Sequence, residues 1–142
     1  MVTPVTGSTS HMEAFSVETD IPGGPQAAWR AREIARRELE HRVAGPLVDD
    51  VALLLTELVA NGVRHGGGVE GTELRIRLES RPPALHVEVV NPDHALVRIG
   101  PRDPDLDGGG GLGLHIVDRV SNRWGVRDGP PVAVWFELDA LL

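Results

Sequence analysis

The apolar residues of this chain change their spacing partway along the sequence, and this change limits the fold more than any other feature. From residue 47 to residue 59 they recur every three or four positions, the period of an amphipathic helix. Between residues 74 and 89 they alternate with polar residues, the period of a strand. Because such a helix and such strands must bury their apolar sides, the sequence predicts helices packed on a sheet.

The same two periods place the other elements. Helices are expected at residues 25–42, from residue 47 to about 65, and from residue 113 to 124. Strands are expected at residues 14–18, 74–79, 85–89 and 132–138. This order predicts an α+β fold, a two-layer sandwich in which about three helices cover one face of a mixed β-sheet.

The segments without periodicity lie at the start of the chain and after the second predicted hairpin strand. Residues 1–12 are small and polar, which predicts a disordered tail or a cloning remnant, so that residues 13–142 form a single domain. Residues 91–113 are rich in glycine and proline. A loop of that length in a compact domain is usually a lid over a functional site or disordered.

Composition excludes several classes of protein. The chain has 142 residues and a net charge of −7, which disfavours general binding to nucleic acid. All fourteen basic residues are arginine, so a P-loop site and Schiff-base chemistry, which need lysine, are excluded. The absence of cysteine excludes disulfides and thiol chemistry. No signal peptide or lipidation pattern is visible, and a cytoplasmic location is expected.

A carboxylate and an amide stand four residues apart in the second predicted helix. Glu57 and Asn61 therefore project from the same side of that helix. A carboxylate can accept a proton from a hydroxyl, and an amide oxygen suits Mg²⁺ that is held mainly by phosphates. The pair is suited to processing a nucleotide, but it also fits an ordinary helix surface.

A glycine cluster precedes the third predicted helix. Its residues Gly108, Gly110 and Gly113 match the spacing of a dinucleotide fingerprint. That fingerprint must follow a buried strand directly, and here a polar segment with two prolines precedes it instead, so the match is misleading. What remains is either a glycine loop that brings an anion such as phosphate to a helix N-terminus, or a flexible surface loop.

Taken together, these motifs resemble those of a known superfamily. The segment from Glu57 to Gly66 looks like the helix motif of the GHKL ATPases, and the segment from Gly111 to Leu114 resembles their second glycine motif. The small size and the segments around Trp124 and Trp135 are similar to the bacterial anti-sigma-factor serine kinases and related ATP-binding regulators. The resemblance covers residues 14–138.

The resemblance implies a Bergerat fold that binds ATP and Mg²⁺. It implies that the protein phosphorylates a serine of an anti-anti-sigma-type partner, with a sigma factor as a possible second partner and a homodimer as a possible assembly. Glu57 would be the general base and Asn61 the Mg²⁺ ligand, while the backbone N–H groups of Gly111 and Gly113 would meet the phosphates. The implied nucleotide contacts are Asn61, His65, Asn91, Asp93, Gly109, Gly110, Gly111, Leu112 and Gly113.

Two of these positions leave alternatives open. His65 either lines the site or caps its helix. Asn91 stands where the family usually has an aspartate that accepts a hydrogen bond from the adenine amino group, and an amide is a weaker, uncharged acceptor. Asp93 compensates only if Pro92 redirects the chain. The departure at Asn91 favours an alternative function, a module that sequesters a partner protein and uses nucleotide only structurally or not at all.

Overall fold

The computed structural model describes residues 13–65, 73–91, 110–127 and 131–140. Its helices are α2 (Ala27–Leu39), α3 (Gly45–His65) and α5 (Gly110–Val120). Its strands are β1 (Ser16–Pro22), β2 (Glu73–Arg81), β3 (Ala84–Asn91), β4 (Arg123–Arg127) and β5 (Val132–Asp139).

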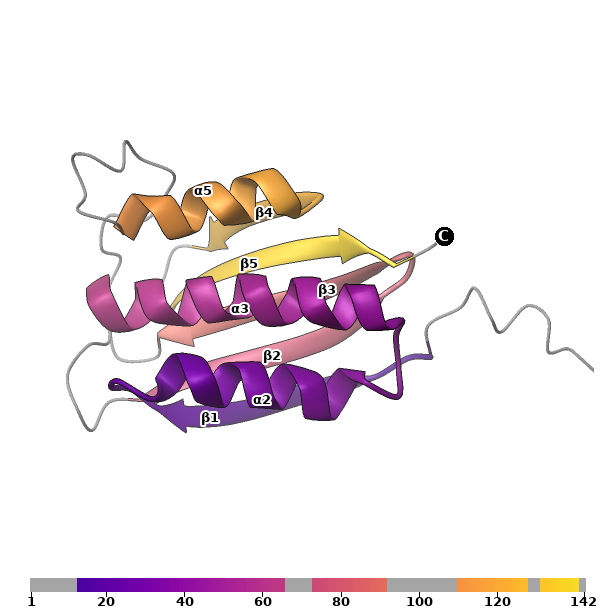
Figure 1. Cartoon of the computed structure of the whole chain (residues 1–142), viewed down its shortest axis with the longest axis horizontal. Helices are drawn as coiled ribbons and strands as arrows, with labels where there is room; N and C mark the ends of the chain where they lie inside the picture. Colours follow the sequence, from indigo (N-terminus) through magenta and orange to yellow (C-terminus); the bar gives the residue numbers. More distant parts are fainter. Residues whose placement is uncertain (1–12, 66–72, 92–109, 128–130, 141–142) are drawn as a thin grey trace, which may run out of the picture.

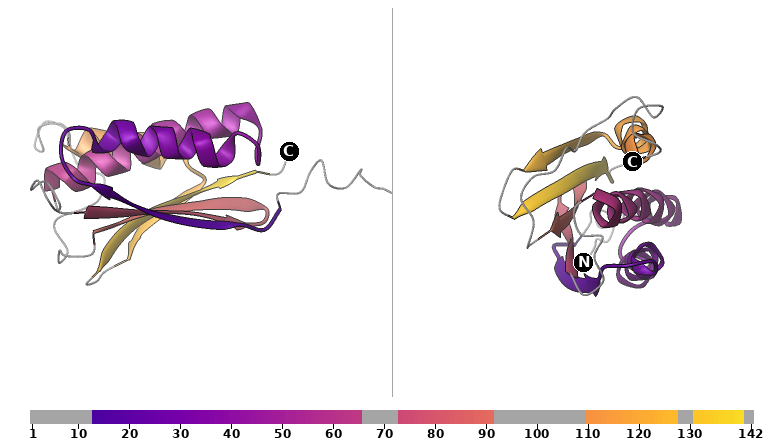
Figure 2. Two further views of the ribbon diagram at one scale, coloured as in Figure 1. Left: turned by 90° about the horizontal axis from the view of Figure 1, so that it is seen from below. Right: turned by 90° about the vertical axis from the view of Figure 1, so that its left-hand side faces the viewer.

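The described elements form two layers. The strands make one five-stranded sheet in the order β1-β2-β3-β5-β4. The helices cover one face of this sheet, and α3 lies between α2 and α5 (Figure 1). Figure 2 shows the other face of the sheet without a covering layer of described elements. The α+β sandwich expected from the sequence is confirmed.

One detail of that expectation is wrong, because the sheet is antiparallel rather than mixed in every described pair. The crossover through α5 does make β3 and β4 run in the same direction. However, β5 returns from β4 and lies between these two strands, antiparallel to both. β3 and β4 are therefore parallel, but they are not neighbours in the sheet.

β4 was not expected from the sequence, which assigned Trp124 to the preceding helix. α5 ends at Val120, and Trp124 lies in β4. The indole N–H of Trp124 donates to Asp118 Oδ1 over 2.7 Å and so ties the strand back to the helix. Helical spacing alone cannot distinguish these assignments, because position 124 also lies one turn beyond Val120. The apolar side chains on alternate residues, Trp124 and Val126, are the strand signal that was missed.

The other boundaries shift by a few residues. β1 extends to Pro22 rather than ending at residue 18. Proline is tolerated there because β1 is an edge strand of the sheet and Pro22 is its last residue.

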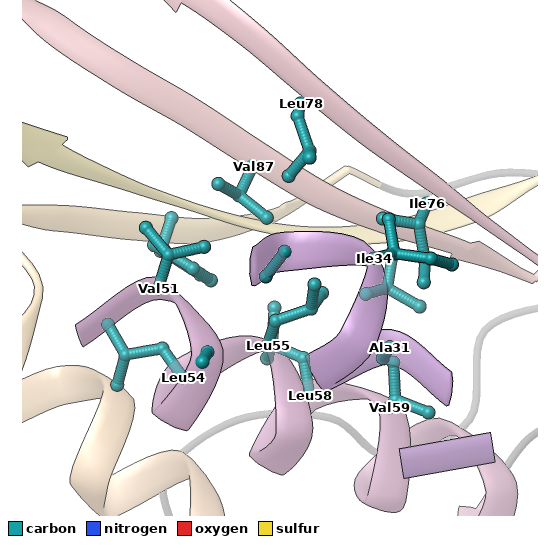
Figure 3. Packing of buried hydrophobic residues seen from close by; sticks show 14 of the residues in the cluster. Ala31, Ile34, Val51, Leu54, Leu55, Leu58, Val59, Ile76, Leu78 and Val87 are labelled. Atoms are coloured by element: carbon teal, nitrogen blue, oxygen red, sulfur yellow. The ribbon is translucent and has the colours of Figure 1, made fainter. Parts of the chain in front are cut away.

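The core lies between the two layers and is built mainly on α3. Val51, Leu55 and Leu58 of this helix face Leu78 and Val87 of the sheet, and each of these five is at most 2% exposed (Figure 3). These side chains repeat at the helical period on one partner and at the strand period on the other, as the sequence predicts. The same stripe carries polar residues where α3 approaches its end.

Candidate functional site

Two asparagines continue the core-facing pattern beyond its apolar part. On β3 the side chains of Leu85, Val87 and Val89 belong to the core, and Asn91 is the next residue in that alternation. On α3, Asn61 lies three residues after the buried Leu58 and so occupies the same face. Asn61 is 4% exposed and Asn91 is 6% exposed. Polar amides therefore replace apolar side chains at the end of the core.

Both asparagines lie at the same end of the molecule. α3 runs toward the left of Figure 1, β3 also ends there, and α5 begins there. The register places Asn91 opposite Val132, the first residue of β5. The end of α3, the end of β3 and the beginning of α5 thus meet at one edge of the sandwich.

The side-chain oxygen of Asn91 is buried and has no hydrogen-bond partner within the part of the chain that the structure describes. Such a group costs about 1–3 kcal/mol when it is left unpaired. The other buried polar side chains of the sheet, His86 and Glu88, are both hydrogen-bonded. The amide of Asn91 is therefore suited to receive an N–H or O–H donor from a ligand.

Glu57 lies one turn before Asn61 on the side of α3 that faces α5. Figure 3 shows Leu54 pointing toward α5, and Glu57 and Asn61 follow it by three and seven residues. Glu57 is half-buried. Among the described residues, neither side chain of this pair has a hydrogen bond or ion pair. A carboxylate without a partner is available to take a proton from a bound group.

α5 begins earlier than the sequence indicated. Gly110, Gly111, Leu112 and Gly113 form its first turn, rather than a loop that ends at residue 113. The backbone N–H groups of a first turn have no partner within the helix, and the helix dipole adds positive potential there. Glycine lacks a Cβ, so a ligand can approach this backbone closely. The correction leaves the expected anion-binding role chemically sound.

Three positions implied by the sequence are not located by the structure. Asp93 and Gly109 lie outside the described residues. His65 is the last residue of α3, but its side chain is also outside the described part, so lining the site and capping the helix both stay predictions.

A metal at this edge would depend on the nucleotide for most of its ligands. Within the described ranges, no group of three or more His, Cys, Asp or Glu side chains is placed to hold a metal ion. Asn61 offers one amide oxygen, which suits Mg²⁺ when phosphates and water supply the other ligands. The residues present fit a phosphate-bound Mg²⁺ better than a metal caged by the protein.

A separate cluster of charges occupies the sheet face that lacks helices. Glu88 is fully buried there, and Arg127 donates to both of its carboxylate oxygens over 3.1 and 2.9 Å. Arg77 adds a bond of 3.2 Å to Glu88. The ring nitrogens of His86 lie 2.9 Å from Glu88 and 2.8 Å from Glu137. His86 is 4% exposed and bridges these two carboxylates.

The partners in this cluster control the acidity of its carboxyl groups. Burial raises the pKa of Glu88, but hydrogen bonds from His86 and Arg127 outweigh it and hold this pKa far below the usual 4.5. The pKa of Glu137 is also lowered, because hydrogen bonds from Arg123 and His86 overcome its burial. Sequence reasoning missed this cluster, since its signal is the pairing of opposite charges across strands that are distant in sequence.

Trp135 covers part of the same face. Its ring stacks on His86 with 5.5 Å between ring centroids. It lies opposite Gly125 of β4, whose missing side chain leaves room for the indole. The cluster and this aromatic contact hold β3, β4 and β5 together on the side away from the helices.

The fold is a Bergerat-type α+β sandwich in which α3, β3 and α5 reach the same edge, and comparison with known families identifies its class. The family profile of the histidine kinase-like ATPase domain matches residues 21–135. The chain belongs to that family and is a GHKL-type domain that binds ATP. A search of curated proteins gave no match. No helix in the described part of the chain is long and apolar enough to cross a membrane.

Proposed function

We propose that this protein is an ATP-dependent serine/threonine kinase of the anti-sigma-factor class, acting on an anti-anti-sigma-type partner protein. The observation that carries the nucleotide part of the proposal is the buried side-chain oxygen of Asn91, which has no hydrogen-bond partner among the described residues and lies at the edge where α3 ends and α5 begins. The kinase part rests on Glu57, a half-buried carboxylate without a described partner, one turn before Asn61. The family match supports a kinase-like ATPase domain.

Each residue of the edge has one task in this proposal. ATP, when bound, would supply its γ-phosphoryl group to the serine oxygen, and ADP would be the leaving group. Glu57 accepts the proton of the attacking serine hydroxyl, and Asn61 would hold Mg²⁺ through one amide oxygen, so that the metal could neutralise the phosphates. The first turn of α5 holds the phosphates through its N–H groups. Phosphoryl transfer depends mainly on positioning and charge neutralisation, so this small set is chemically sufficient.

The partner assignment comes from the resemblance of the helix and glycine motifs. It includes a sigma factor as a second partner, a homodimer as the assembly, and the cytoplasm, where ATP is abundant, as the compartment. A specific observation supports a second candidate function, a module that sequesters its partner: Asn91 is uncharged and so binds the base less strongly than a carboxylate would. The experiments below separate these two functions.

Replacing Glu57 by glutamine should abolish transfer without abolishing nucleotide binding. The amide keeps the shape of the side chain but does not take up the serine proton, and loss of a general base typically lowers a rate by about 10²–10⁴-fold. Transfer is measured with ATP labelled at the γ-phosphate and the anti-anti-sigma-type proteins encoded in the same genome. ATP affinity is measured by calorimetry.

The matched control is Glu33→Gln, because Glu33 is an exposed glutamate of α2 with no described partner. It should transfer phosphate at the wild-type rate. A wild-type protein that binds ATP but phosphorylates none of these partners would favour the sequestering module. An active Glu57→Gln variant would show that the proton goes to another group.

Asn61→Ala should weaken binding of ATP with Mg²⁺ much more than binding of ATP in EDTA. The physical reason is that the lost amide oxygen acts on the metal and not on the nucleotide itself. Calorimetric titration with and without Mg²⁺ gives both affinities for the same variant. An equal loss under both conditions would contradict the assignment of Asn61 as a metal ligand.

A further inference from the structure

The amide of Asn91 also determines which bases the proposed nucleotide site can accept. We infer that the base subsite takes 6-oxopurine nucleotides, those of guanine and hypoxanthine, as well as adenine nucleotides. This inference rests on the proposed nucleotide site and adds its substrate class.

The part of the nucleotide that meets Asn91 follows from hydrogen-bond chemistry. The atom of Asn91 that has no partner within the described ranges is an oxygen, so it needs a hydrogen-bond donor. Ionised phosphates have only acceptor oxygens and do not satisfy it. The neighbours of Asn91 within the sheet include Val89, two residues earlier on the same strand, and Val132, its pairing partner on β5, and both are buried. Valine walls suit the flat, largely apolar ring of a base better than a ribose with its hydroxyl groups.

An amide differs from a carboxylate in having both kinds of hydrogen-bonding group. It accepts through Oδ1 and donates through its N–H groups, and rotation of the amide exchanges their positions. Adenine presents an amino donor beside a ring-nitrogen acceptor. Guanine and hypoxanthine present a carbonyl acceptor beside a ring N–H donor. Asn91 matches either arrangement, whereas an aspartate at this position could accept only from the ring N–H of a 6-oxopurine, because it has no donor for the adjacent carbonyl and repels it.

The test is calorimetric binding of ADP, GDP and IDP, which lack the γ-phosphate and so report affinity apart from transfer. In the wild type the three dissociation constants should lie within about tenfold of one another, since each base offers one donor to the buried oxygen. CDP is the control for nonspecific capture of the diphosphate. In Asn91→Asp, ADP should be retained, and GDP and IDP should weaken by at least about a hundredfold relative to ADP.

The matched control variant is Asn122→Asp. It makes the same change of charge at an exposed asparagine, whose Oδ1 accepts a hydrogen bond from the backbone N–H of Asp139. An aspartate also accepts that bond, so this variant should keep the wild-type selectivity. If the added negative charge acted only by repelling phosphate at long range, Asn122→Asp would bind ADP, GDP and IDP more weakly, and by a similar factor.

A wild-type measurement keeps the inference testable if Asn91→Asp does not fold. The diphosphate of unsubstituted purine riboside has neither the amino nor the oxo group at position 6, so it should bind at least about tenfold more weakly than ADP. Equal binding would overturn the inference. So would wild-type protein that binds ADP but binds GDP a hundredfold more weakly, and in that case the proposed function would stand. Absence of binding by every nucleotide would overturn the proposed function itself.

Discussion

Gly125 shows how much a single missing side chain contributes to the sheet. A Cβ built at this position would lie 2.9 Å from Cζ2 of Trp135, 3.0 Å from Cε2 and 3.1 Å from Nε1. An indole ring is rigid, and this one is also stacked on His86. If the indole ring shifted to make room for an added methyl group, the aromatic contact and the strand pair would both be disturbed.

Gly125→Ala should destabilise the protein by about 1–3 kcal/mol, the usual cost of overpacking. The control is Gly45→Ala at the first residue of α3, where an added Cβ meets no atom within 4 Å. That substitution should be neutral or stabilise by up to about 1 kcal/mol, because alanine reduces the freedom of the unfolded chain. Urea unfolding followed by circular dichroism measures both. Equal free energies of unfolding for the two variants would show that the Trp135 ring moves aside without a loss of stability.

At the scale of the elements, the sheet has two faces that are held by different forces. The helix-covered face is apolar and buried against α2 and α3. The opposite face is held by ion pairs that cross four strands, from Arg77 of β2 through Glu88 of β3 and Glu137 of β5 to Arg123 and Arg127 of β4. Acid should affect this second face first, because its carboxylates have to remain ionised.

The free energy of unfolding should decrease as the pH falls below about 5. In the folded protein Glu88 and Glu137 both have a pKa below the usual 4.5, so they stay ionised where the same groups in the unfolded chain take up protons. The unfolded state then binds more protons, and acid favours it. Stability from this source is present above the unfolded pKa and is lost toward lower pH.

Urea unfolding between pH 7 and pH 3 measures this dependence. Glu137→Gln should show a shallower decrease than the wild type, because one of the two carboxyl groups no longer titrates. Glu33→Gln, which removes an exposed glutamate without a described partner, should follow the wild-type curve. A Glu137→Gln curve parallel to the wild type would place the acid sensitivity in other carboxyl groups.

For the whole molecule, local periodicity was sufficient to predict most of the fold. The stripe of α3 and the alternation of β2 and β3 each lie within one element, so the sequence predicted those elements and the sandwich that they build. The position of β5 between β3 and β4 is not visible locally, and neither is the strand identity of Trp124. Both depend on contacts between distant segments.

The candidate site shows the same limit. The sequence singled out Glu57, Asn61 and Asn91, and the structure places the two asparagines at one end of the core. The sequence did not predict that the Asn91 oxygen lacks a partner in the part of the chain that the structure describes, because that depends on the neighbouring strand and helix rather than on the local sequence. The charge cluster of Glu88 was missed for the same reason.

The position of β5 also makes the chain prone to aggregate during part of its synthesis on the ribosome. β5 is the last of these strands to be made, yet it lies inside the sheet, where it pairs with both β3 and β4. Until Val132 and the residues after it leave the ribosome, the backbone N–H and C=O groups along one edge of β3 have no strand to pair with. Unpaired backbone groups on an apolar strand are a template for pairing with other chains. Aggregation during translation is therefore most favoured in the interval between completion of β3 and emergence of β5.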